Sequence, residues 1–157
     1  MRLESRVAGG SKVVKFDGTG WTGIAVRHYK DGDGRHGGVT RRVLLGERPG
    51  EEALNIVTRY FEVASRGYST LERHQHPHTV IVVRGTGRVV LDDTIYAVEP
   101  YDCVYVAPDT LHQFQASDDE SLGFLCIVDR DRDRPKLPSV EDVDRLTRAG
   151  IPTKPGT

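Results

Sequence analysis

Short apolar runs separated by turn residues fill the middle of the chain, from residue 41 to residue 128. Turn signals such as Arg84-Gly85-Thr86-Gly87 and Ala107-Pro108-Asp109-Thr110 recur along this stretch. No apolar stripe of helical period is long enough to compete, so the pattern predicts an all-β domain. The expected strands cover residues 42–45, 55–64, 70–74, 79–84, 88–91, 94–98, 103–106, 112–116 and 122–128.

These strands predict two face-packed sheets or a closed barrel, because a single open sheet of nine strands would leave one apolar face in water. Of the architectures that solve this problem, we expect a jelly roll. The predicted barrel covers residues 41–130.

The two ends of the chain have a different composition from the barrel. Residues 1–40 are rich in glycine and contain the only tryptophan, Trp21, so we expect an N-terminal arm with a possible edge strand. Residues 131–157 form the expected tail. Within it, Ser139 with an acidic residue three positions later predicts a short capped helix that ends at Gly150.

Charge and hydropathy argue against two classes of partner. The chain has 22 Lys and Arg against 23 Asp and Glu, which lacks the basic footprint of nucleic-acid binding. The best uncharged run, residues 122–128, is far shorter than the roughly 20 residues of a membrane span, and the N-terminus lacks the apolar core of a secretory signal. We therefore expect a cytoplasmic protein. Cys103 and Cys126 both lie in apolar runs, which favours small buried hydrophobic residues over a disulfide. The apolar setting of Cys126 is expected to raise the pKa of its thiol and make it inert.

Three of the six histidines alternate in the segment His74-Gln75-His76-Pro77-His78. Alternate residues of a strand project to one face, so His74 and His76 are expected to point to one place, and His78 to open the next strand. His112 is the expected partner from elsewhere in the chain. Four neutral imidazoles would hold one divalent transition metal ion, Mn, Fe, Zn, Ni or Cu, without selecting among them. The alternative interpretation is a solvated loop of hydrogen-bonded histidines.

These residues resemble the two motifs of the cupin superfamily. The first motif is matched by Gly67, His74-x-His76, His78 and Gly85, and the second by Tyr101-Asp102, the strand CVYV, Ala107-Pro108, His112 and Phe114. His78 stands where the family usually has glutamate, and Tyr101 where glycine is common. The resemblance covers residues 41–128. It implies a double-stranded β-helix, the jelly-roll cupin barrel, with His74, His76, His78 and His112 as metal ligands, an open coordination position and a homodimer.

Histidine in place of glutamate leaves such a site one charge more positive, so we predict a small anionic substrate. In residues 55–63 the odd positions are the better interior candidates, which would point Arg59 inward to clamp the anion in a bidentate way. Tyr60 and Glu62 would then face outward. Arg59 at the sheet surface is the alternative, because a one-residue change of register exchanges the two faces.

The favoured function is a metal-dependent enzyme acting on a small organic anion. Its chemistry would be that of an oxidoreductase of dioxygenase type or of a Lewis-acid isomerase or lyase. Two alternatives remain at this stage: a non-catalytic module that binds or senses a metabolite, and a barrel without chemistry. His28 and His36, in glycine-rich sequence, are expected to be bystanders.

Overall fold

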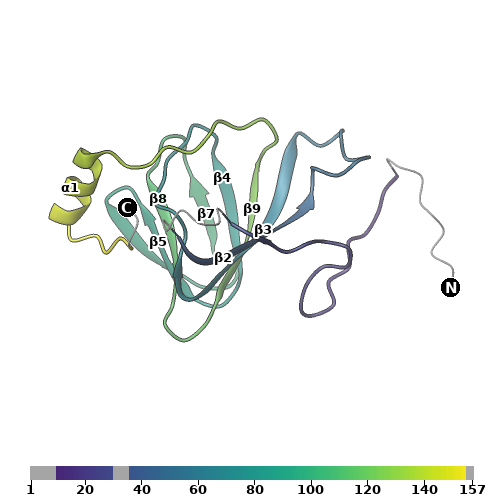
Figure 1. Cartoon of the computed structure of the whole chain (residues 1–157), viewed down its shortest axis with the longest axis horizontal. Helices are drawn as coiled ribbons and strands as arrows, with labels where there is room; N and C mark the ends of the chain where they lie inside the picture. The colour runs from purple at the N-terminus through teal and green to yellow at the C-terminus, as the bar shows by residue number, and fades with distance from the viewer. Residues whose placement is uncertain (1–9, 30–35, 155–157) are drawn as a thin grey trace.

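The protein is described by a computed structural model that covers residues 10–29 and 36–154. Strands curl into a sheet, with a helix at one end and the N-terminal arm extending from the other (Figure 1). The elements are β1 (Arg27–His28), β2 (Gly37–Leu45), β3 (Ile56–Tyr68), β4 (His78–Arg84), β5 (Gly87–Leu91), β6 (Thr94–Val98), β7 (Cys103–Val106), β8 (His112–Ala116), β9 (Leu122–Asp129) and α1 (Val140–Arg148). The all-β jelly-roll fold with a short C-terminal helix is confirmed.

Strand β3 organises the sheet. The strand order is β6-β5-β8-β3-β9-β4-β7, and β2 pairs with both β1 and β3. All pairs are antiparallel, and β3 lies opposite β2 on one side and β9 on the other. Its last residue, Tyr68, pairs with Gln115 of β8. Because β3 is 13 residues long and changes partner along its length, it carries the chain around the curl.

The inside of the curl is filled by aliphatic and aromatic side chains. In β3 the alternation of the strand places Val57, Arg59, Phe61 and Val63 on this inner face, each less than 9% exposed. Tyr60, expected to face outward, alternates with these residues and lies on the other face of the strand, yet it is only 4% exposed. The ring of Trp21 from the N-terminal arm lies 4.9 Å from the Tyr60 ring and covers it from outside.

The expected strand at residues 70–74 is wrong. This stretch is a loop that makes two isolated bridges, Glu72 with His112 and Arg73 with Lys136. The backbone groups of Glu72 exchange hydrogen bonds with those of His112, at 3.1 and 2.9 Å. Tertiary pairing therefore fixes the loop, although its sequence resembles a strand.

The C-terminal tail is anchored by α1. The Ser139 hydroxyl accepts from the Asp142 N–H, the Asp142 carboxylate accepts from the Ser139 N–H, and Gly150 follows the C-cap with φ of 70°. The capped helix is thus confirmed. Leu146 packs with Leu71 and Leu111 in a small second core, which docks the helix on the barrel.

Two other expectations concern cysteines and membranes. Neither cysteine forms a disulfide; Cys126 is buried, but Cys103 is exposed, which corrects the expectation that both are buried. Cys103 begins β7, whose residues alternate between exposed and buried. No helix within the described ranges is long and apolar enough to cross a membrane.

Candidate metal centre

Four histidines from three segments converge inside one end of the barrel. His74 and His76 come from the loop after β3, His78 is the first residue of β4, and His112 is the first residue of β8. The ring centroid of His74 lies 3.7 Å from that of His76, 4.5 Å from that of His78 and 4.8 Å from that of His112. The loop, rather than the expected strand face, brings His74 and His76 together, with their rings stacked at 5°. The structure thus gathers the four predicted ligands.

The Nδ1 atom of each of these four imidazoles already has a partner. His74 Nδ1 lies 2.7 Å from the His76 carbonyl oxygen, and His112 Nδ1 lies 2.9 Å from the Thr110 carbonyl oxygen. Because a carbonyl oxygen can only accept, both Nδ1 atoms carry the proton and donate. His76 Nδ1 lies 2.7 Å from the carboxylate of Asp133, and His78 Nδ1 lies 3.5 Å from Cys126 Sγ. This arrangement leaves the Nε2 lone pairs for a metal ion.

The remaining nitrogen atoms fit a transition metal. The Nε2 atoms of His74 and His78 are buried and have no hydrogen-bond partner among the described residues, which is costly unless something binds there. Burial, with the neighbouring His112 and His76, lowers the pKa of His74 to about 4. Burial and the other histidines also lower the pKa of His78. Both imidazoles are therefore neutral at pH 7, as metal ligands must be.

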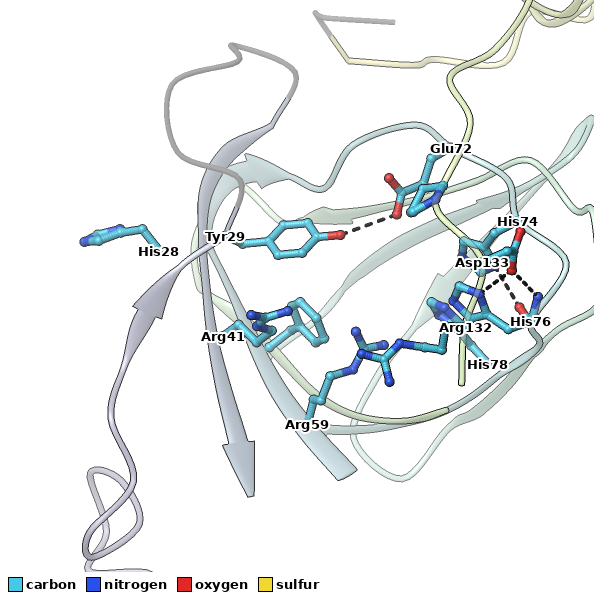
Figure 2. Close-up of a pocket in the computed structure, with 12 residues that line it drawn as sticks. His28, Tyr29, Arg41, Arg59, Glu72, His74, His76, His78, Arg132 and Asp133 are labelled. Atoms are coloured by element: carbon cyan, nitrogen blue, oxygen red, sulfur yellow. Dashed lines mark hydrogen bonds and ion pairs between the residues drawn. The ribbon is translucent and has the colours of Figure 1, made fainter. Parts of the chain in front are cut away.

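A carboxylate that the sequence interpretation missed also faces this cluster. Ligand atoms of Glu72, His74 and His112 all lie within 4.8 Å of one another, and Glu72 is 6% exposed. The Tyr29 hydroxyl donates to Glu72 at 3.4 Å (Figure 2). The available signal was position, because Glu72 continues the alternation of His74, His76 and His78 by one step towards the N-terminus.

Asp133, from the tail after β9, was also missed. It holds His76 Nδ1 and accepts the backbone N–H groups of Gln75 at 2.8 Å and His76 at 3.0 Å (Figure 2). These hydrogen bonds lower the pKa of Asp133 and keep its carboxylate ionised, and the bond from the Gln75 N–H has the largest effect. Its sequence context, DRDRDR, shows no spacing that links it to a histidine 57 residues away.

A cavity of about 320 Å³ opens onto the histidine cluster, a size suited to a small metabolite. Arg41, Arg59 and Arg132 line it together with Tyr29 and Phe61. A smaller inner cavity, about 40 Å³, reaches His78, His112 and Cys126. His28, expected to be a bystander, lines the outer cavity but is exposed and points away from the cluster in Figure 2.

Cys126 contributes a thiol to this site. Its Sγ lies 3.2 Å from a terminal guanidinium nitrogen of Arg59 and 3.5 Å from His78 Nδ1. Burial raises the pKa of the thiol, as the sequence predicted, and the nearby Arg59 guanidinium acts in the opposite direction. The expectation of an inert thiol did not include these two polar neighbours.

Comparison with known proteins agrees with this geometry. Residues 59–128 match the family model described as "Cupin domain", a range that contains the four histidines, Arg59 and Cys126. The chain is also 42% identical, over 80% of its length and 79% of the relative, to 1-methylthio-D-xylulose 5-phosphate methylsulfurylase from Rhodospirillum rubrum. The chain belongs to the cupin superfamily.

Solved cupin structures are similar to this protein over most of its chain. A cupin-2 domain protein from Rhodospirillum rubrum is 41% identical, with a TM-score of 0.75 over 82% of this chain and 84% of that one. A cupin 2 domain-containing protein from Halorhodospira halophila is 42% identical, with a TM-score of 0.70 over 91% and 97% of the two chains. The similarity extends beyond the matched cupin domain, into the ends of the chain.

Proposed function

We propose that this cupin is a metal-dependent enzyme that removes a methylthio group from a phosphorylated ketose, and that the sulfur atom of Cys126 accepts this group. The observation that carries the proposal is a buried thiol between Arg59 and His78, beside a four-histidine cluster. The relative named a methylsulfurylase supports the substrate class. A substrate of this class is a small anion, and the proposal takes the Lewis-acid lyase branch of the chemistry predicted from the sequence rather than oxygenation.

His74, His76, His78 and His112 would hold the metal ion through Nε2. Bound there, a divalent transition metal supplies Lewis-acid polarisation of the ketone oxygen, which makes the adjacent carbon a better leaving group. The protein's own part is to keep the four imidazoles neutral and oriented, through the Nδ1 partners described above.

Cys126 reacts as the thiolate. When His78 uses Nε2 as a ligand, its Nδ1 carries the proton and donates towards Sγ, and Arg59 donates a second hydrogen bond to the same atom. Two donors on one sulfur favour its charged form, in opposition to burial, which raises the pKa of the thiol. Phe114 and Phe124 form apolar walls of the inner cavity.

The transfer balances with these groups. The Cys126 sulfur attacks the methylthio sulfur, a sulfur–sulfur bond forms, and the bond from that sulfur to C1 of the ketose breaks. The electron pair moves to C1, next to the carbonyl carbon, and C1 takes a proton from solvent in the outer cavity, which the hydrogen-bonded pair of Tyr29 and Glu72 can relay. This proton balances the one that the Cys126 thiol releases when it ionises. The products are a 1-deoxyketose phosphate and a methyl disulfide on Cys126. An external thiol then reduces the disulfide and restores the cysteine.

The proposal is tested by mixing the metal-loaded protein with 1-methylthio-D-xylulose 5-phosphate in the absence of a second thiol. Intact-protein mass spectrometry should show one methylthio group in place of one hydrogen, and peptide mapping should place it on Cys126. Addition of a small thiol should then give turnover.

Cys126→Ser should lose the adduct and the turnover while it still binds metal with wild-type stoichiometry. Cys103→Ser is the matched control, because Cys103 is exposed and outside the site, and it should keep both. Turnover by Cys126→Ser at the wild-type rate would overturn the role of this thiol.

A further inference from the structure

Three arginines from separate segments line the outer cavity. Arg41 lies on β2, Arg59 on β3, and Arg132 in the tail after β9. Figure 2 shows all three side chains directed into the same pocket. A gathering of like charges in a partly enclosed space is unfavourable unless an anion compensates it.

The register of the sheet places two of these charges on one face. Arg41 pairs with Phe61, and Val43 pairs with Arg59, so Arg41 and Arg59 are diagonal neighbours on the inner side of β2 and β3. Like charges on neighbouring strands destabilise a sheet. Burial lowers the pKa of Arg41, and the Arg59 guanidinium acts in the same direction, as this diagonal placement predicts.

Arg59 is the most enclosed of the three guanidiniums. It is 6% exposed, its Nε is buried without a hydrogen-bond partner among the described residues, and its guanidinium carbon lies 5.0 Å from the centre of the Phe61 ring. Within the described ranges, one terminal nitrogen is used, as the donor to Cys126. A guanidinium has five N–H donors, so Arg59 has capacity for a ligand in the cavity.

Arg132 completes the group from the opposite side. One of its terminal nitrogens donates to the backbone carbonyls of Asp129 and Arg130, which fixes the side chain over the cavity. The other lies 3.5 Å from Glu47, whose side chain is 42% exposed, so that pair is weak and can be displaced.

The two carboxylates that line this cavity do not neutralise the arginines. Asp133 is held by His76 and two backbone N–H groups, and Glu72 accepts from Tyr29. Four neutral imidazoles around a divalent ion add further positive charge. Three guanidiniums and two carboxylates leave the cavity lining with a formal charge of +1, and a bound divalent ion would raise it to +3, which a dianion balances better than a singly charged carboxylate.

The geometry points to a subsite for a phosphate dianion, formed by Arg41, Arg59 and Arg132, that holds the phosphorylated end of the substrate while the ketone end faces the histidines. This inference rests on the proposed function and specifies its substrate recognition. Guanidinium groups match the oxygen geometry of phosphate in two-point contacts, which explains why arginine rather than lysine lines the wall. Arg59 and His78 both contact the Cys126 sulfur, so the arginine group lies only a short distance from the histidine cluster.

The test is calorimetric binding to the metal-loaded protein, with D-xylulose 5-phosphate and D-xylulose as matched probes. Wild type should bind the phosphorylated sugar at least about 100-fold more tightly. Arg41→Gln and Arg132→Gln should each reduce this ratio about tenfold, and the double variant should bring the two Kd values within a few fold. Metal stoichiometry and affinity for D-xylulose should stay at wild-type values in all of them.

Two controls make the outcome specific. Arg84→Gln changes an exposed arginine on the outer surface and should keep the full ratio. Arg41→Lys keeps the positive charge but cannot make the two-point contact of a guanidinium. It should regain part of the preference for the phosphorylated sugar that Arg41→Gln loses. An unchanged ratio in the double variant, or inorganic phosphate binding as tightly as the sugar phosphate, would overturn the subsite.

This result is separable from the chemistry. Loss of phosphate preference in the double variant, with no methylthio transfer by wild type, would retain the subsite and end the proposed reaction. Methylthio transfer by wild type, with a preference that the variants do not alter, would retain the reaction and end the subsite.

Discussion

A single carboxylate outside the barrel strands fixes one of the four imidazoles. Asp133 binds His76 Nδ1 and the two backbone N–H groups of the same loop, so it orients both the ring and the segment that carries it. A carboxylate behind a ligating histidine raises the basicity of the ligand and lowers the cost of holding it in place.

Asp133→Ala should therefore weaken metal binding about 10- to 100-fold, because His76 loses the partner that fixes its tautomer and orientation. Competition against a chromophoric chelator measures the change directly. Asp131→Ala, two positions earlier at an exposed site, is the matched control and should keep wild-type affinity. Equal affinity in the two variants would contradict the role of Asp133.

At the residue scale, sequence identified the histidines but not their supports. Alternation in a pentapeptide is visible locally, and His112, at the start of a predicted strand after the Pro108 loop, was the remaining candidate that the cupin motifs also match. Asp133 and Arg132 reach the site only because the tail crosses back over the cavity, and nothing in DRDRDR encodes that path. Glu72 was within reach of the same alternation argument and was overlooked.

At the scale of elements, the link between β2 and β3 is held by a buried glutamate. Glu51 is 6% exposed and accepts the N–H groups of Gly46 at 2.6 Å and Arg48 at 3.1 Å, with Lys12 and the Arg48 guanidinium as ion-pair partners. Burial alone would raise the pKa of Glu51, but Lys12 and the two N–H groups outweigh it and lower the pKa to about 2.

Glu51→Gln should lower the free energy of unfolding at pH 7 by about 1–3 kcal/mol, the range for hydrogen bonds to a charged group. The folded pKa lies below the ordinary value of 4.5, so the stabilisation is complete above pH 4.5 and is lost as the pH falls towards 2. Urea unfolding at several pH values should show the wild type and the variant converging over that range. Glu52→Gln, at the exposed neighbour, should have a smaller effect; a constant difference between Glu51→Gln and wild type at all pH values would contradict the assignment.

Strand positions were predictable where burial alone sets the alternation, as in β3, β4 and β9. The turn between β4 and β5 was equally predictable from its glycines. In the structure Gly85 has φ of 68°, and an added Cβ would lie 1.8 Å from the Ser121 carbonyl oxygen, so the turn requires glycine there. The histidine loop was not predictable, because its backbone bonds to His112 and Lys136 come from distant segments. Tyr60 lies on the expected face, but its burial was not predictable, because Trp21 from the distant arm covers it.

At the scale of the whole molecule, bound metal should act as a stabilising ligand, because the four imidazoles converge only in the folded state. A free metal concentration about 1,000 times Kd should add about 4 kcal/mol to the free energy of unfolding. That corresponds to a rise in Tm of about 2–4 °C per kcal/mol for a chain of this size. Calorimetry with metal and with a chelator measures the difference.

His76→Ala combined with His112→Ala removes two of the four donors and should abolish the shift. An identical Tm for wild type with metal and with chelator would favour the barrel without metal chemistry. The homodimer implied by the family resemblance stays a prediction, which analytical ultracentrifugation of the full chain would check.

The segment that supplies Arg132 and Asp133 begins just after the matched cupin domain ends at residue 128. A barrel of this kind can therefore keep its metal-binding strands unchanged while the few residues that follow them are rewritten. Related chains with the same histidines could in this way diverge in the molecules they accept, and alignments restricted to the shared domain would miss the positions at which that divergence occurred.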